Sequence, residues 1–197
     1  SALSTENREK IRKSVISFAD DRLVTIVNQV LDNVDDSFFD IAEKSTSTTE
    51  QTQYFDAMRE LRKKRDAASK AFSKLFLDNL RSLDSSSSDK SSSHPENHNL
   101  SVEEELSLIQ DDQLEESLAQ SSIYTKARLR CSRQLTALEV RIGNLCSNIE
   151  IDEDNNPLDP QQIVAIFSKA TDVIDLDLKA RIILYKHFDK VIAKDFV

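Results

Sequence analysis

Two groups of charged side chains have the types and spacing that chemistry on a ligand would need. The first is acidic and consists of Asp111, Asp112, Glu115 and Glu116. Paired carboxylates can act as a general acid and a general base. Negative side chains in the first turn of a helix also complement the helix dipole, and we favour this structural interpretation.

The second group is a basic run within a predicted helix. It consists of Arg59, Arg62, Lys63, Lys64 and Arg65. Such a run could contact phosphate groups or nucleic acid. It is also typical of a solvated helix face, because Asp56, Glu60 and Asp66 lie at helical spacing from it. We favour the solvated face, with pairing to the acidic group of a neighbouring molecule as a further alternative.

Metal and redox chemistry find little support in the sequence. The segment 152–157 resembles the start of a calcium loop, but Pro157 stands where the loop requires glycine and Ile163 where it requires glutamate. His94 and His98 lack a third ligand nearby. We therefore predict no metal and no cofactor.

The single glycine, Gly143, excludes glycine-rich phosphate loops elsewhere in the 197 residues. With only three prolines as well, the chain has few residues that favour tight turns and hairpins. Helices joined by polar loops are therefore expected, and Gly143 itself falls inside a helical apolar seam. There it would permit either close helix packing or a slight kink.

Composition restricts the class of partner. A net charge of −9 argues against a general nucleic-acid binder, which needs a cationic surface to displace counterions from phosphates. No apolar run approaches the roughly 20 residues needed to span a bilayer. We expect a cytoplasmic protein without membrane association.

The segment 84–99 divides the chain, because it contains serine, charged and other polar residues but no aliphatic or aromatic side chain. It is too polar to bury the apolar area that would offset the entropy of ordering it. We predict a helical hairpin over 1–84, a flexible Ser-rich linker over 85–99 and a helical segment over 100–197 that packs with the first as one bundle. The ending on Phe196 and Val197 suggests a fragment of a longer protein.

The first half contains two long amphipathic patterns. One runs from about Glu6 to Lys44. Residues 20–21 and 33–36, where cap-favouring residues cluster, are two places at which it could bend or break. Thr48 with Gln51 fits a capping box for the second, which extends to about Leu83. A polar turn of five residues between them predicts an antiparallel hairpin.

The second half predicts a short helix or turn near residues 106–109 and three further helices. The first of the three starts near Asp111 and carries an apolar seam that includes Cys131 and Cys146. The two cysteines are about 22 Å apart along one helix, too far for a disulfide between them. We expect both to be buried, reduced thiols, because both lie on the apolar seam. Asp159 with Pro160 caps the next helix, and Asp175 caps the last. The fold class is therefore all-α, a bundle of five to six helices.

Several blocks in this order resemble the N-terminal region of a large proteobacterial family of uncharacterised cytosolic proteins, some of which carry the label thymidine phosphorylase. The blocks are residues 35–42, 54–62, 106–116, 156–158 and 182–189. The resemblance implies a bacterial protein several times longer than this chain. A phosphorylase must hold phosphate in a preformed polar site, usually with glycine-containing loops, and these residues show none.

We therefore predict a non-enzymatic helical module for protein–protein interaction or regulation, an adaptor within a larger bacterial protein. Its partner would be another protein, another region of the parent chain or a second copy of itself. The alternative is a regulatory module that binds a nucleotide or nucleic acid through phosphate groups. The candidate interaction residues are Arg59, Arg62, Lys63, Arg65, Asp111, Asp112, Glu115 and Glu116.

Overall fold

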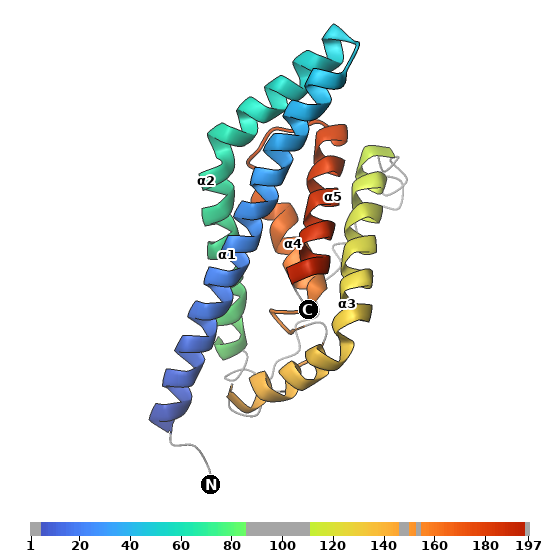
Figure 1. The fold of residues 1–197 in the computed structure, drawn as a ribbon. Helices are drawn as coiled ribbons and strands as arrows, with labels where there is room; N and C mark the ends of the chain where they lie inside the picture. Colours follow the sequence, from blue (N-terminus) through green and yellow to red (C-terminus); the bar gives the residue numbers. More distant parts are fainter. Residues whose placement is uncertain (1–4, 86–110, 146–149, 153–154, 196–197) are drawn as a thin grey trace, which may run out of the picture.

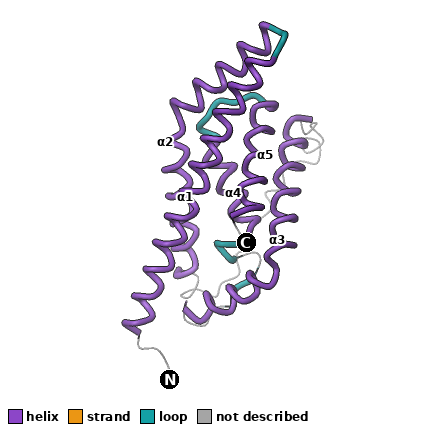
Figure 2. The backbone as a smooth tube through the Cα atoms, in the orientation of Figure 1, coloured by secondary structure: helices purple, strands orange, loops and turns teal. Residues whose placement is uncertain are grey.

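The computed structural model describes residues 5–85, 111–145, 150–152 and 155–195. These residues form five α-helices and no strand, which confirms the predicted all-α class (Figures 1 and 2). The helices are α1 (Thr5–Lys44), α2 (Thr48–Ser85), α3 (Asp111–Leu145), α4 (Pro160–Thr171) and α5 (Leu178–Asp195). Over the described ranges, none of these helices is both long and apolar enough to cross a membrane. Ser85, the first residue of the predicted Ser-rich linker, ends α2. Outside the described part lie the rest of that linker, the short helix predicted near 106–109, Cys146 and the last two residues.

Helices α1 and α2 form the predicted antiparallel hairpin (Figure 1). Helix α1 is continuous over its 40 residues, without a break at residues 20–21 or 33–36. The predicted cap of α2 is one residue off. Ser47 accepts a hydrogen bond from the backbone N–H of Glu50 at 3.4 Å, and Ser45 donates to the Glu50 carboxylate at 2.5 Å. Ser47 is therefore the N-cap, because it directly precedes the first helical residue, Thr48. The reciprocal half of a capping box is not formed, because the Ser47 N–H donates to the Ser45 hydroxyl oxygen instead of to Glu50.

The core lies between the hairpin and α3. Helix α5 packs on α1, α4 packs on α2, and α3 packs on both α4 and α5 from the other side (Figure 1). Phe38, Phe72 and Phe76 from the hairpin are fully buried in one cluster with Phe167 and Phe188. The last two rings stack with their centroids 3.8 Å apart. Burial of each of these five phenylalanines contributes about 1.5–3 kcal/mol to stability.

The two C-terminal helices begin at aspartate caps. Asp159 accepts a hydrogen bond from the Gln161 N–H at 2.8 Å, and Pro160 occupies the first helical position, as predicted. The predicted cap at Asp175 is wrong. Asp177 accepts from the Ala180 N–H at 2.8 Å and caps α5, because it directly precedes the first helical residue, Leu178.

Helix α3 is sharply kinked at Cys131, a position at which the spacing of its apolar residues gave no sign of a kink (Figure 1). The backbone of Cys131 has φ −109° and ψ 19°, outside the helical region. Before the kink, Ile123 and Ala127 belong to the main core. After it, Ile142 belongs to a second cluster with Leu83 of α2 and Ile151. The kink therefore lets one helix pack against two different parts of the bundle.

Gly143 is not the origin of this kink. It is buried within the helical part of α3 that follows Cys131. Of the two roles expected for it, close helix packing agrees with this position.

The buried Cys131 carries a reduced thiol. Its Sγ atom lies 2.9 Å from the Ala127 carbonyl oxygen, and burial raises the pKa of this thiol.

Candidate functional site

Glu116 lies at the centre of a hydrogen-bonded cluster that joins α3, α4 and α5. Its Oε1 atom accepts from the Tyr185 hydroxyl at 2.6 Å and from the Arg181 guanidinium at 2.9 Å. Gln120 donates to Ser168 and to the Tyr185 oxygen, both at 3.1 Å. The Glu116 carboxylate thus links α3 to α5, and Gln120 and Tyr185 extend the network to Ser168 of α4.

The protonation states and hydrogen bonds in this cluster indicate a structural role more than a catalytic one. Burial and the hydrogen bond to Glu116 raise the pKa of Tyr185 to about 12, so its hydroxyl stays protonated and acts as a donor. Burial alone would lower the pKa of Arg181, but its hydrogen bonds to Asp172 and Glu116 raise it above the usual value. Since the carboxylate is neutralised and its Oε1 is occupied by donors, it is poorly placed to take a proton from a substrate.

The other three predicted acidic residues do not join Glu116 in this cluster. Glu115 is exposed on the adjacent position of α3. The side chains of Asp111 and Asp112 lie outside the described part. Paired catalytic carboxylates are therefore not formed by the two acidic residues whose side chains the structure describes, Glu115 and Glu116.

The basic run on α2 is engaged in ion pairs within the hairpin. Arg62 makes a bidentate contact with Asp35 of α1, at 2.7 Å for each pair of atoms, and this contact raises the pKa of Arg62. Arg65 pairs with Asp32 of α1 at 2.7 Å. Within α2, Arg59 pairs with Asp56 at 2.7 Å and Lys63 with Glu60 at 3.5 Å.

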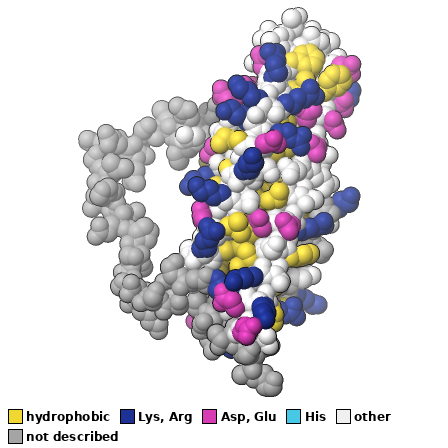
Figure 3. All heavy atoms as spheres, turned by 90° about the vertical axis from the view of Figure 1, so that its left-hand side faces the viewer, with side chains coloured by type: hydrophobic (Ala, Val, Ile, Leu, Met, Phe, Trp, Pro, Cys, Tyr) yellow, Lys and Arg dark blue, Asp and Glu magenta, His cyan; other side chains and the backbone are white. Residues whose placement is uncertain are grey.

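These ion pairs agree with the interpretation of the basic run as a solvated helix face. On the side of the molecule where the hairpin lies, Lys and Arg side chains are intermixed with Asp and Glu (Figure 3). A phosphate group would have to compete with carboxylates already at hydrogen-bonding distance. The tertiary fold thus uses Arg62 and Arg65 to hold α2 against α1.

The calcium-like loop and His187 have local structural roles. In the predicted calcium-like loop, Asp152 and Asn155 bond to each other's backbone N–H groups, at 3.1 and 2.9 Å. His187 of α5 lies 2.7 Å from the Ser37 hydroxyl of α1, and burial together with Lys190 lowers its pKa. Within the described residues, no group of three or more His, Cys, Asp and Glu side chains could hold a metal ion. His94 and His98 lie outside them.

An open groove lies between α1 and the part of α3 that follows the kink, and we call it the α1–α3 groove. Its volume is about 640 Å³. The α1 wall is formed by Val15, Phe18, Ala19, Leu23 and Ile26, and the α3 wall includes Leu135, Ala137 and Leu138. The amphipathic helices predicted from the sequence contain many of these residues. The spacing of their apolar side chains gave no sign that the two walls would face each other across an open space.

Three arginines line the same groove: Arg22 from α1, and Arg133 and Arg141 from α3. None of the lining residues is an aspartate or glutamate. This local basic character contrasts with the net charge of −9 for the whole chain. The groove therefore offers an apolar floor together with positive charge.

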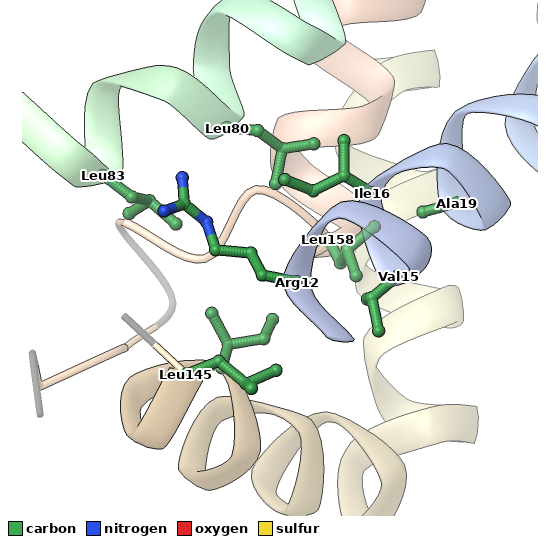
Figure 4. Close-up of a pocket in the computed structure, with 9 residues that line it drawn as sticks. Arg12, Val15, Ile16, Ala19, Leu80, Leu83, Leu145 and Leu158 are labelled. Atoms are coloured by element: carbon green, nitrogen blue, oxygen red, sulfur yellow. The ribbon is translucent and has the colours of Figure 1, made fainter. Parts of the chain in front are cut away.

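The groove continues into a smaller cavity of about 40 Å³, with which it shares Val15, Ala19 and Leu158. This cavity is lined by Leu80 and Leu83 of α2 and by Leu145 of α3, and Arg12 of α1 extends along it (Figure 4). It is almost entirely apolar. The α1–α3 groove thus has a deeper end where α1, α2 and α3 approach one another.

Phe18 is the residue whose spacing could have pointed to this site. It follows Ile11 and Val15 at helical spacing near the start of α1, and its side chain is 73% exposed. Ile11 and Val15 are each 39% exposed. These apolar side chains in the first half of α1 are the pattern that could have predicted a surface available to a partner.

The fold and the groove define an all-helical domain with an open apolar surface. By its sequence, the chain belongs to the DUF1631 N-terminal domain family: the family model, described as the N-terminal domain of a protein of unknown function, matches residues 8–196. No curated protein and no solved structure matches the chain. The predicted resemblance to the N-terminal region of an uncharacterised family is thereby confirmed.

Proposed function

We propose that this chain is a non-enzymatic helical module for protein–protein interaction, an adaptor or regulatory part of a larger bacterial cytoplasmic protein. The observation that carries the proposal is the exposed Phe18 at the edge of the α1–α3 groove. Its partner is another protein or another region of the parent chain. The docking surface is the groove, not the charged groups that the sequence favoured.

The two halves of α1 differ sharply in burial. In the second half, Val30 and Phe38 are fully buried under the rest of the bundle. In the first half, Val15 and Phe18 remain exposed beside the groove. Removing a phenylalanine side chain from water contributes about 1.5–3 kcal/mol, so this surface gains free energy when a partner covers it.

The phosphate-binding alternative receives less support. The arginines at its centre, Arg62 and Arg65, are paired with Asp35 and Asp32 across the hairpin. A ligand would have to replace these pairs instead of meeting uncommitted positive charge. We therefore favour the interaction module.

The proposal is tested by an affinity pull-down from a lysate of the native bacterium, with wild-type chain, Phe18→Ser and Leu129→Ser compared. Leu129 is a matched control, because it is 76% exposed and does not line the groove. We expect wild type and Leu129→Ser to recover the same protein, and Phe18→Ser to lose it. Circular dichroism and thermal unfolding verify that both variants keep the fold.

Two outcomes would contradict the proposal. One is that the wild-type chain recovers no specific protein, even after chemical cross-linking of the lysate. The other is that Phe18→Ser recovers the partner as well as Leu129→Ser does, which would place the docking surface elsewhere.

A further inference from the structure

We propose that the α1–α3 groove receives an acidic amphipathic helix from the partner protein. This inference rests on the proposed function and adds the chemistry and shape of what is bound. Charge, groove length and the exposure of the lining residues support it separately.

Charge indicates the sign of the partner's polar face. Arg22 lies on the α1 wall, while Arg133 and Arg141 lie on the α3 wall. Since none of the lining residues carries a negative charge, a basic partner would meet repulsion from Arg133 and Arg141 on the α3 wall. Asp or Glu side chains beside an apolar stripe would instead form charge-assisted hydrogen bonds with the guanidiniums of these two arginines.

The length of the walls indicates a helix of about three turns. On α1 the lining residues run from Val15 to Ile26, and on α3 from Cys131 to Arg141. At 1.5 Å per residue these stretches measure about 16 and 15 Å. A partner helix of similar length presents apolar side chains at positions i, i+3 or i+4, i+7 and i+11, which is the common pattern of a helix bound in a groove.

Exposure distinguishes a helix from a small apolar ligand. The volume of about 640 Å³ would suit either one. A small ligand lying on the floor would leave the exposed Phe18 and Val15 largely in water. A helix is about 10 Å wide with its side chains and covers the floor and both of these residues together.

The inference is tested by selecting a random display library of peptides about 16 residues long, enough for four helical turns. The target is the 197-residue chain, and Ala137→Trp and Thr136→Trp serve as a matched pair. Ala137 lines the groove and Thr136 does not, although both are exposed on α3. We expect enriched peptides with apolar residues at helical spacing and Asp or Glu on the flanks. They should bind wild type and Thr136→Trp but not Ala137→Trp.

Charge reversal provides a second arm. The double variant Arg133→Glu/Arg141→Glu should raise the dissociation constant of an enriched peptide roughly tenfold, because two favourable charge pairs become repulsive. Added salt should weaken binding to wild type and strengthen the residual binding to the double variant, because it screens attraction in the first and repulsion in the second. Folding of the double variant is verified by circular dichroism.

Enriched peptides with Lys or Arg flanks would overturn the inference, and so would equal binding to Ala137→Trp or a failure to enrich any helical pattern. Displacement of the peptide by a fatty acid at low concentration would favour a small amphiphile and also overturn it. The proposed function is judged separately by the loss of the native partner in Phe18→Ser. If that loss occurs and the selected peptides are not acidic, the proposed interaction function is supported, and only the inference of an acidic helix is wrong.

Discussion

The hydroxyl of Tyr185 on α5 donates a hydrogen bond to Oε1 of Glu116 on α3 across 2.6 Å. Tyr185 is 1% exposed, and the same carboxylate oxygen accepts from Arg181 at 2.9 Å. Glu116 belongs to the acidic group that first suggested acid–base chemistry. In the folded chain it instead joins the beginning of α3 to α5.

Loss of this contact should destabilise the fold. Tyr185→Phe removes one buried hydrogen bond and should lower the free energy of unfolding by about 1–2 kcal/mol. Glu116→Ala also leaves the Arg181 guanidinium with one carboxylate fewer, and should cost about 2–3 kcal/mol. Urea unfolding measures both. The neighbouring Glu115→Ala is the control and should stay within about 0.5 kcal/mol of wild type. Equal stability of Glu115→Ala and Glu116→Ala would contradict the structural role.

His187 should make stability depend on pH in the weakly acidic range. Its pKa in the folded chain lies below the ordinary value of about 6.5, because of burial and the nearby Lys190. The unfolded chain therefore binds a proton at a higher pH than the folded chain does. The resulting stability is complete above about pH 6.5 and decreases as the pH falls toward the folded-state pKa.

The pH effect is measured by urea unfolding of wild type and His187→Gln between about pH 8 and 5. The difference in stability between the two should shift in favour of His187→Gln as the pH falls. The other two histidines, His94 and His98, are present in both proteins and cancel in the comparison. A difference that does not change with pH would show that the environment of His187 leaves its titration unaltered.

The pairing of Arg62 with Asp35 should be recoverable by exchange. Arg62→Glu places two negative charges opposite each other across the hairpin and should lower the urea midpoint, as should Asp35→Arg. The double variant Asp35→Arg/Arg62→Glu restores opposite charges and should recover part of the loss. If the basic run bound phosphate instead, Arg62→Glu would abolish binding of a radiolabelled nucleotide or RNA to the chain, and the exchange would not restore it.

Gly143→Ala distinguishes a packing role from a merely tolerated glycine. At an exposed helix position this change would stabilise by up to about 1 kcal/mol through helix propensity. Because Gly143 is buried in α3, the added methyl group should instead overpack its surroundings and destabilise by about 1–3 kcal/mol. Urea unfolding decides between the two signs, and stabilisation would show that the neighbouring side chains leave room for a methyl group.

Much of the fold is readable from local sequence. The spacing of apolar residues predicted the α1–α2 hairpin, and the pair Asp159-Pro160 located the start of α4 to the residue. Such features depend on hydrogen bonds and side chains within one or two turns, so nearby residues suffice to specify them. The caps at Ser47 and Asp177 were each missed by one or two residues, because several adjacent Ser, Thr or Asp residues are equally capable of capping.

By itself, the sequence determined that this protein is helical, that glycine-built ligand loops are absent, and where most of its helices lie. Only the tertiary structure decided the kink at Cys131 and the groove that it creates beside α1. Neither proline nor glycine marks the kink, which arises where α3 passes from the main core to the cluster of Ile142 and Leu83. The same holds for Arg62 and Glu116, whose charges were visible in the sequence. Their partners, Asp35 and Arg181, are distant along the chain, and the packing of the helices brings each pair together.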